Sequence, residues 1–308
     1  MNTVAAIAGV VIKELYRRKD FYVLLVLTGV ITALLGSINF FNDSNIVRYL
    51  KEICLLLIWI SSLVICITTA ARQIPAERES RTIFPLLAKP VTRWQVVVGK
   101  FLGCWIACGI ALVMFYLFFA IVSEARGRSV AGAKPHPKSS VASTQAVAKI
   151  EAAASVGHDK HDHHGHDDHD EDAAATSGSP LANYFQALWL HWMMLGVVTA
   201  MVLFGSVVFT APSSNATICF IGVLGILYLG AHLHKVALRL TEPSQSILST
   251  IYFLIPHLEW YDIRDRVIYD QPAIAWGLCG LASLYALQYV LVFLVLAWLT
   301  FRRKALSV

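Results

Sequence analysis

Long apolar runs constrain this chain more than any other feature of its sequence. Six predominantly apolar segments of roughly bilayer-crossing length are separated by polar stretches. Only 15% of the residues are charged, against roughly 25% in soluble domains. A backbone in lipid must satisfy its own hydrogen bonds, so each segment is predicted to be a helix. We expect an all-α polytopic membrane protein with transmembrane helices at 21–41, 53–71, 101–122, 185–209, 216–231 and 273–301.

Polar segments divide the predicted chain into three regions. Residues 2–19 are amphipathic and end in a basic cluster, which predicts a helix at the cytoplasmic interface; an extension of the first span is the alternative. No cleavable signal peptide is evident. We expect residues 1–122 to hold this helix, spans one to three and a basic loop at 72–100, residues 123–183 to form a largely disordered outer loop, and residues 184–308 to hold spans four to six with an outer segment at 239–272.

The loop at 72–100 sets the expected orientation. It holds six Lys or Arg residues and two acids, and short basic loops next to spans are typical of the cytoplasmic side. With six spans, both termini share that side. The expected inner segments then carry four acids and the outer segments 16. We therefore expect a multi-pass protein of the inner (cytoplasmic) membrane with both termini in the cytoplasm.

The same loop carries a resemblance. The stretch ERESRTIFPLLAKPVTRWQVVVGKFLG resembles the pattern of the ABC type-2 (ABC-2) transporter permease family, and KELYRRK near the N-terminus is similar to that family's interfacial segment. FLIPHLEWYDIRDRVIYD, residues 253–270, is similar to the corresponding segment of the subgroup that includes nitrous-oxide-reductase maturation permeases. The matching loop residues are Glu79, Arg81, Thr82, Leu86, Leu87, Lys89, Pro90, Val91, Arg93, Gly99 and Lys100.

The resemblance implies a permease that pairs with a second copy of itself and with two cytoplasmic ABC ATPase subunits, which would hold ATP and Mg²⁺. In the loop, Ile83, Leu86 and Leu87 share one helical face, as a segment seated in a partner's cleft requires. The alternative is that the loop's charges only contact anionic lipid headgroups. The predicted coupling residues are Glu77, Glu79, Arg81, Thr82, Ile83, Leu86, Leu87, Lys89, Pro90 and Arg93.

No catalytic or cofactor-binding site is predicted in this chain. The Gly99–Lys100 pair lacks the GxxxxGK[ST] frame that cradles phosphate, because Trp94 stands where a glycine is required and Phe101 follows the lysine. We therefore expect ATP hydrolysis in a separate subunit. The net charge of +5 lies on membrane-flanking segments, so nucleic acid is not an expected partner.

A histidine-rich tract, GHDKHDHHGHDDHDED at 157–172, is the second informative stretch. Closely spaced imidazoles bind zinc or copper without one fixed geometry. A solvated linker without a metal is the alternative reading. The predicted ligands are His158, His161, His163, His164, His166 and His169.

The outer segment 239–272 is expected to form short helices or a re-entrant element. The resemblance implies that it closes the outer mouth of a pathway, where Pro256, Glu259, Asp262 and Arg264 are the predicted residues. Its charges either pair with one another, which is the default, or bind a periplasmic protein.

A few polar and aromatic residues in the spans carry weaker predictions. His191 is either a functional buried group or a hydrogen-bonded histidine at the interface. Trp189, Trp192, Trp260 and Tyr261 are predicted interface residues. Cys104 and Cys108 share a helix face, and packing is favoured there over a soft-metal site.

These features predict a permease subunit that couples ATP hydrolysis by partner subunits to transport or to conformational signalling. Two alternatives remain: a mechanical transducer for metal-centre assembly, and a stand-alone membrane protein that binds metal through its His-rich loop.

Overall fold

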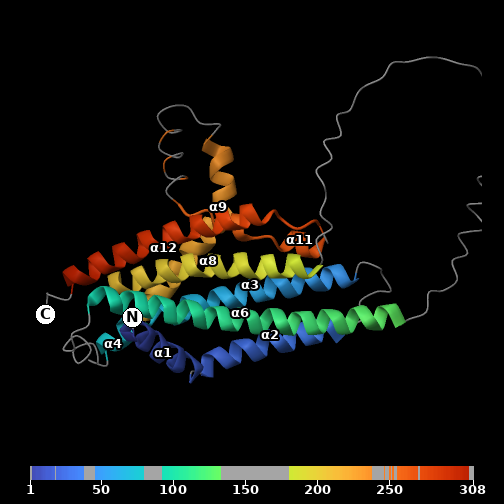
Figure 1. The fold of residues 1–308 in the computed structure, drawn as a ribbon, viewed down its shortest axis with the longest axis horizontal. Coiled ribbons are helices and arrows are strands. Elements are labelled where there is room, and N and C mark those ends of the chain that lie inside the picture. The colour runs from blue at the N-terminus through green and yellow to red at the C-terminus, as the bar shows by residue number, and fades with distance from the viewer. Residues whose placement is uncertain are drawn as a thin grey trace, which may run out of the picture.

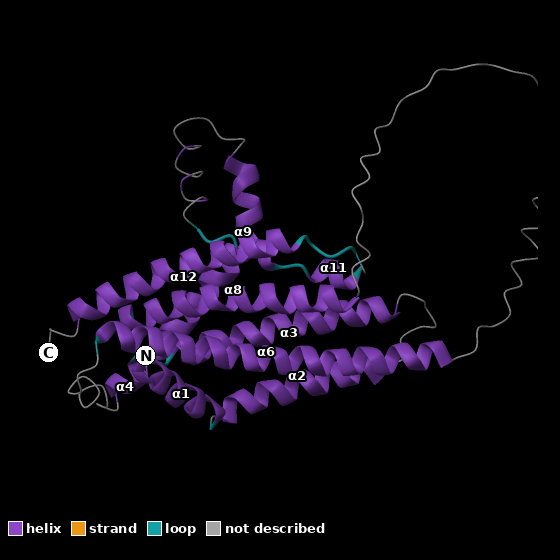
Figure 2. Ribbon diagram, viewed as in Figure 1, coloured by secondary structure: helices purple, strands orange, loops and turns teal. Residues whose placement is uncertain are grey.

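A computed structural model gives the chain an all-helical fold (Figures 1 and 2). It describes residues 2–17, 19–37, 46–79, 92–132, 180–237, 246, 250, 252, 255–269 and 271–304. The elements are α1 (Asn2–Tyr16), α2 (Lys19–Ser37), α3 (Ile46–Ala71), α4 (Pro75–Glu79), α6 (Arg93–Gly132), α8 (Pro180–Val208), α9 (Pro212–Ala237), the 3-10 helix η1 (Leu258–Tyr261), α11 (Arg264–Ile268) and α12 (Trp276–Lys304).

Four helices within the described residues are long and apolar enough to cross a membrane. They cover Lys51–Glu77, Arg93–Ser123, Leu181–Val208 and Trp276–Arg303, and they match the expected second, third, fourth and sixth spans. α2 and α9 stand where the first and fifth spans are expected, with Pro212–Tyr228 of α9 forming a shorter apolar helix. The all-helical membrane fold is thus confirmed, and the count of six spans stays a prediction.

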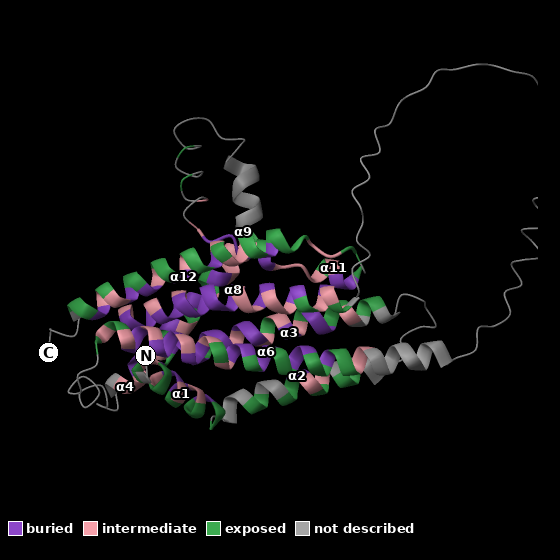
Figure 3. Cartoon of the chain, in the orientation of Figure 1, coloured by how far each residue is buried: buried purple, intermediate pink, exposed green. Residues whose placement is uncertain are grey.

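The long helices pack around α8. It contacts α3, α6, α9 and α12, and Met194, Leu195, Val198 and Leu203 on it are fully buried. Buried residues gather on α8 and on the sides of α3 and α6 that face it, whereas much of α12 is exposed (Figure 3). Exposed leucines on an apolar helix of spanning length are what a lipid-facing surface requires. The start of α1, the end of α12 and α4 lie at one end of the bundle, here called the α4 end, and α11 lies at the other, the α11 end (Figure 1).

Several helices extend beyond the apolar runs that predicted them. α3 begins at Ile46, inside the expected outer loop, and α6 runs from Arg93 to Gly132, so it takes turns from both the expected basic loop and the expected disordered segment. α8 and α9 begin at Pro180 and Pro212, ahead of the predicted positions, because proline fits the first helical turn. Apolar length marks the lipid boundary, whereas the hydrogen-bonded helix continues into polar residues. The tract 157–172 lies outside the described residues.

α1 packs on the first turns of α6 through two glycines. A Cβ at Gly99 would lie 2.9 Å from the Ile7 Cβ, and one at Gly103 would lie 2.7 Å from the Val11 Cβ. Only a residue without a side chain lets the two backbones approach this closely. α1 is therefore amphipathic as predicted, and its apolar face lies on the neighbouring helix α6.

α6 and α8 are joined by a reciprocal pair of tryptophans. Trp105 and Trp192 stack with ring centroids 4.6 Å apart, and each indole N–H donates to the other residue's carbonyl, at 3.0 and 3.2 Å. Each ring also lies against a glycine of the opposite helix, Trp192 on Gly109 and Trp105 on Gly196. Trp192 thus packs between two helices, where Gly109 leaves space for its ring, and its predicted place in a membrane-interface belt stays a prediction.

Candidate functional site

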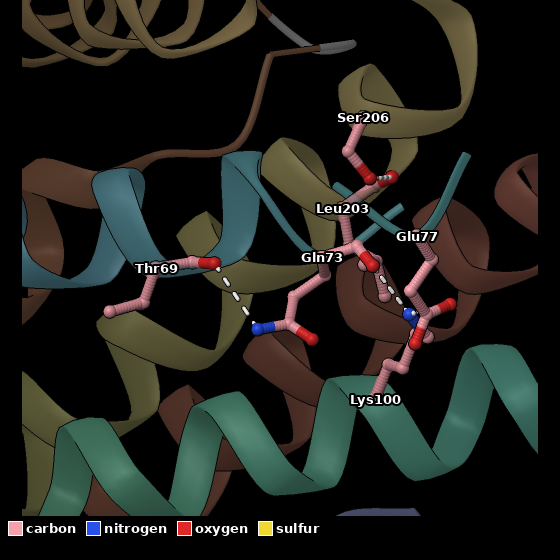
Figure 4. Close-up of polar contacts among 6 residues, drawn as sticks. All are labelled: Thr69, Gln73, Glu77, Lys100, Leu203 and Ser206. Carbon is pink, nitrogen blue, oxygen red and sulfur yellow. Dashed lines mark hydrogen bonds and ion pairs between the residues drawn. The ribbon is translucent and has the colours of Figure 1, made fainter. Parts of the chain in front are cut away.

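A buried lysine organises the α4 end of the bundle. The side chain of Lys100 projects from α6 toward α4 (Figure 4) and is only 2% exposed. Its Nζ lies 2.5 Å from Oε2 of Glu77 on α4 and also donates to the backbone carbonyl of Gln73. One cation therefore connects α6 both to α4 and to the turn between α3 and α4.

The turn is held from the α3 side as well. Gln73 is buried, and its Nε2 donates to the Thr69 carbonyl at 3.4 Å (Figure 4). The last carbonyls of a helix lack partners within it, and those beyond its end need donors from elsewhere. Lys100 is the donor for the Gln73 carbonyl, so its ammonium group holds the turn after α3 while it pairs with Glu77.

α8, which packs against both α3 and α6, carries a buried polar contact of its own. Leu203 and Ser206 are fully buried, and the Ser206 hydroxyl donates to the Leu203 carbonyl at 2.7 Å (Figure 4). Because Lys100 is 2% exposed, its charge is stabilised chiefly by the paired carboxylate. Glu77 itself is 32% exposed, so the pair reaches from the interior to the surface.

The structure describes the side chains of two predicted coupling residues, Glu77 and Arg93, and they contact different helices. Glu77 meets Lys100, whereas Arg93 at the start of α6 donates to the Arg302 carbonyl at the end of α12, at 2.8 Å. Trp94 and Trp298 add an edge-to-face contact between the same two helices. The Glu79 backbone belongs to α4, but its side chain lies outside the description. The remaining predicted coupling residues, Arg81, Thr82, Ile83, Leu86, Leu87, Lys89 and Pro90, also lie outside the described residues.

Two residues of this site were absent from the predicted set. Lys100 was interpreted as one of the loop's basic residues, and Gln73 was not singled out. The sequence does hold one signal for Lys100. It lies seven residues after the start of α6 and is followed by apolar residues, and a charge at such a position is costly and usually has a partner.

The α11 end carries a second set of polar contacts. Arg264 donates to both carboxylate oxygens of Asp262, at 2.7 and 2.6 Å, and its guanidinium lies 5.1 Å from the ring of Trp59 on α3. Burial lowers the pKa of Arg264, but the hydrogen bonds and charge of Asp262 outweigh burial, so the net pKa lies above its ordinary value. The predicted pairing of charges with one another is confirmed for these two residues.

A further contact ties α3 to this end. Arg48 near the start of α3 lies over the Tyr269 ring at 4.3 Å and donates to its hydroxyl at 3.2 Å. Of the other predicted outer-mouth residues, Pro256 accepts the Leu258 N–H just before η1, and Glu259 lies on η1. α3 therefore contacts α11 and the residue that follows it at one end and leads directly into α4 at the other.

His191 is hydrogen-bonded, as one of the two alternatives predicted; its position relative to the membrane surface stays a prediction. It is buried on α8, and its Nε2 lies 2.8 Å from the Ser62 hydroxyl of α3. Its ring also meets Tyr116 of α6 edge-on, so it joins three helices. Tyr261, another predicted interface residue, is likewise buried and donates to the Ala282 carbonyl. Trp260, in contrast, is 57% exposed.

The cysteines behave as small packing residues. All six are buried and free of disulfides. Cys104 packs against Val11 and Leu15 of α1. Within the described ranges, no group of three or more His, Cys, Asp or Glu side chains is arranged to hold a metal ion. The histidine tract falls outside those ranges, so zinc or copper binding stays a prediction.

Comparison with known proteins adds one finding to this geometry. Residues 27–136 match the model of a family described as ABC-2 family transporter protein. The matched region contains most of α2, all of α3, α4 and α6, and therefore every residue of the Lys100 site. No curated protein sequence matches the chain. The family match supports an ABC-2 transporter membrane component, a class whose members pair with ABC ATPase subunits.

Proposed function

We propose that this chain is the permease subunit of an ABC transporter and that it receives the energy of ATP hydrolysis at its α4 end. The observation that carries the proposal is the family match over residues 27–136, which includes both helices joined by Lys100. No step in this proposal requires ATP to bind the chain itself. ATP and Mg²⁺ belong to a separate cytoplasmic ATPase subunit seated against α4 and residues 80–91.

The contacts of Lys100 support a mechanical role for this end. α4 has only five residues, and its Glu77 is tied to α6 through a buried ammonium group that also holds the end of α3. A partner that displaces α4 must therefore move α3 and α6 with it or break a buried ion pair. Breaking such a pair is costly, so concerted movement is the favoured response.

α3 extends this connection to the other end. Its residues Arg48 and Trp59 contact Tyr269 and Arg264, respectively. Movement of α3 at the α4 end thus changes the position of α11 relative to the rest of the bundle. Switching between two packed arrangements is the usual means by which such movements alter access to a pathway.

The finer assignments are part of the same proposal. The α4 end and both termini face the cytoplasm, the α11 end faces outward, and the protein resides in the inner membrane. Two copies assemble with two ATPase subunits. The narrower likeness to nitrous-oxide-reductase maturation permeases rests on residues 253–270, beyond the matched region, and both transport of a solute and mechanical work on an outer protein fit the proposed movement.

Reconstitution tests the proposal. The chain is expressed together with candidate ABC ATPase subunits of the same organism, and any complex is purified into lipid nanodiscs. We expect the ATPase to co-purify and its hydrolysis rate to change on assembly. In Lys100→Met the complex should still assemble, but that change in rate should be lost. The matched control, Lys51→Met near the start of α3, should behave like the wild type. Failure of any ABC ATPase to co-purify would overturn the assignment.

A further inference from the structure

Two buried polar atoms at the α11 end have no hydrogen-bond partner. They are Nδ1 of His257 and Oε2 of Glu259, and no other buried side-chain nitrogen or oxygen in the described part of the chain is unpaired in this way. His257 is only 6% exposed, so water cannot readily satisfy its ring. Buried polar groups are nearly always paired, because an unpaired one costs about 1–3 kcal/mol. The exception calls for a ligand or a second state in which the two atoms are paired.

The surroundings of His257 suit a positively charged ring. Its imidazole centroid lies 4.3 Å from that of Tyr252, 4.9 Å from Trp260 and 6.3 Å from Tyr285, so three aromatic rings surround it. Cations are attracted to aromatic faces at such distances. The Glu259 carboxylate is also near, with Oε1 3.5 Å from Nδ1, a separation that suits an ion pair but not a good hydrogen bond.

We propose that His257 and Glu259 form a proton-binding site that clamps η1 against α12. Imidazole is the side chain that ordinarily gains a proton between pH 8 and pH 5. A proton taken from water makes both ring nitrogens donors, so Nδ1 presents an N–H to the carboxylate whichever nitrogen was protonated before. The ion pair with Oε1 then shortens into a hydrogen bond, so Nδ1 gains a partner and the negative charge that Glu259 shares between its two oxygens is balanced.

The clamp acts between η1 and α12 because His257 is already fixed to that helix. Its backbone N–H donates to the Tyr285 hydroxyl at 3.2 Å, while Tyr261 at the end of η1 donates to the Ala282 carbonyl at 2.8 Å. Glu259 lies between these two attachment points. Pairing Glu259 with His257 therefore ties η1 to the residue that is already bonded to Tyr285 of α12, and it restricts movement of η1 between its two attachment points.

Other ionisable groups near this end leave Glu259 as the anion that faces the ring. Burial, followed by the negative charge of Glu259, raises the pKa of Tyr252, so its phenol stays neutral. Arg264 and Asp262 are paired with each other. The elements that pack against η1 carry further titratable groups. Tyr285 and Tyr289 lie on α12, His191 on α8 is bonded to Ser62, and α9 carries Tyr228.

Trp260 provides a direct reporter, because a protonated imidazole quenches a neighbouring indole. The emission of Trp260 in the full purified chain is obtained as the difference between the wild type and Trp260→Phe, and it is followed from pH 8 to pH 5. We expect a one-proton decrease in the wild type and a flat profile in His257→Phe, which keeps an aromatic ring at the position. Glu259→Gln should weaken proton binding by about tenfold or more, because an opposite charge is lost.

Asp265→Asn is the matched control. Asp265 is an exposed acid on α11, so its removal should leave the titration unchanged. Histidine-selective carbon NMR of the same proteins gives a second readout, in which a titrating ring signal disappears in His257→Phe. A flat wild-type profile, or equal shifts for Glu259→Gln and Asp265→Asn, would overturn the proposal. Neither measurement uses the ATPase subunit, so the outcome is independent of the function proposed above.

Discussion

Removing one or the other partner of the Lys100–Glu77 pair should have unequal effects on stability. Lys100 is 2% exposed and Glu77 is 32% exposed. Without its partner, the lysine therefore stays buried, whereas the glutamate can reach solvent. In Glu77→Ala a cation remains buried without its carboxylate, which costs about 3–5 kcal/mol. In Lys100→Met the carboxylate can turn to solvent, and the main loss is the donor to the Gln73 carbonyl, about 1–3 kcal/mol.

The double variant Glu77→Ala/Lys100→Met separates this reasoning from simple loss of contacts. Once the cation is gone, removal of Glu77 should add little, so the double variant should be about as stable as Lys100→Met alone. The free energy of unfolding is measured by tryptophan fluorescence in mixed micelles of mild detergent and SDS. Glu52→Ala, an exposed acid of α3, is the control and should change stability by less than about 0.5 kcal/mol. The reasoning is refuted if Glu77→Ala is no more destabilising than Lys100→Met, or if the two effects add.

Three further predictions concern packing and the α11 end. Gly103→Val should detach α1 from α6 and expose residues of α1 to proteolysis, whereas Gly9→Val, where a Cβ would have nothing within 4 Å, should not; equal cleavage of both variants would contradict this. Gly196→Val should displace Trp105, whose indole nitrogen would lie 2.9 Å from the new Cβ, and lower the melting temperature by several degrees, as an overpacked core does. Arg264→Lys keeps the charge but loses one of the two hydrogen bonds to Asp262, so hydrogen exchange in α11 should speed up at constant pH; unchanged exchange would show that the bidentate pair does not hold α11.

Apolar length predicted the membrane helices well, and it predicted their ends poorly. The spans around Met194 and Leu112 follow from the need to satisfy the backbone in lipid, which depends on local sequence alone. The start of α6 at Arg93 could not be found this way. Its first turns are polar on one side, and their helical state depends on α1 packing against Gly99.

The residues of the candidate site likewise divide into those that local sequence predicts and those that depend on distant contacts. Glu77 was predicted from its place in a basic loop that resembles a known family, and the structure gives it a buried partner. The partner itself was missed, since nothing local says that Lys100 folds back onto the carbonyl of Gln73, 27 residues earlier. The stacking of Trp192 on Trp105 was missed for a related reason, because it depends on Gly109 of the opposing helix, which lies far away in the sequence.

The central claim is that a separate ATPase engages the α4 end of this bundle, and site-specific photocrosslinking tests it most directly. A photoreactive amino acid replaces Arg72, exposed in the turn before α4, or Asp265, exposed on α11, and cells that express the intact complex are irradiated. The account predicts that position 72 captures an ABC ATPase subunit and that position 265 does not. Capture of that subunit from position 265 alone, or from neither position while the complex is intact, would contradict it.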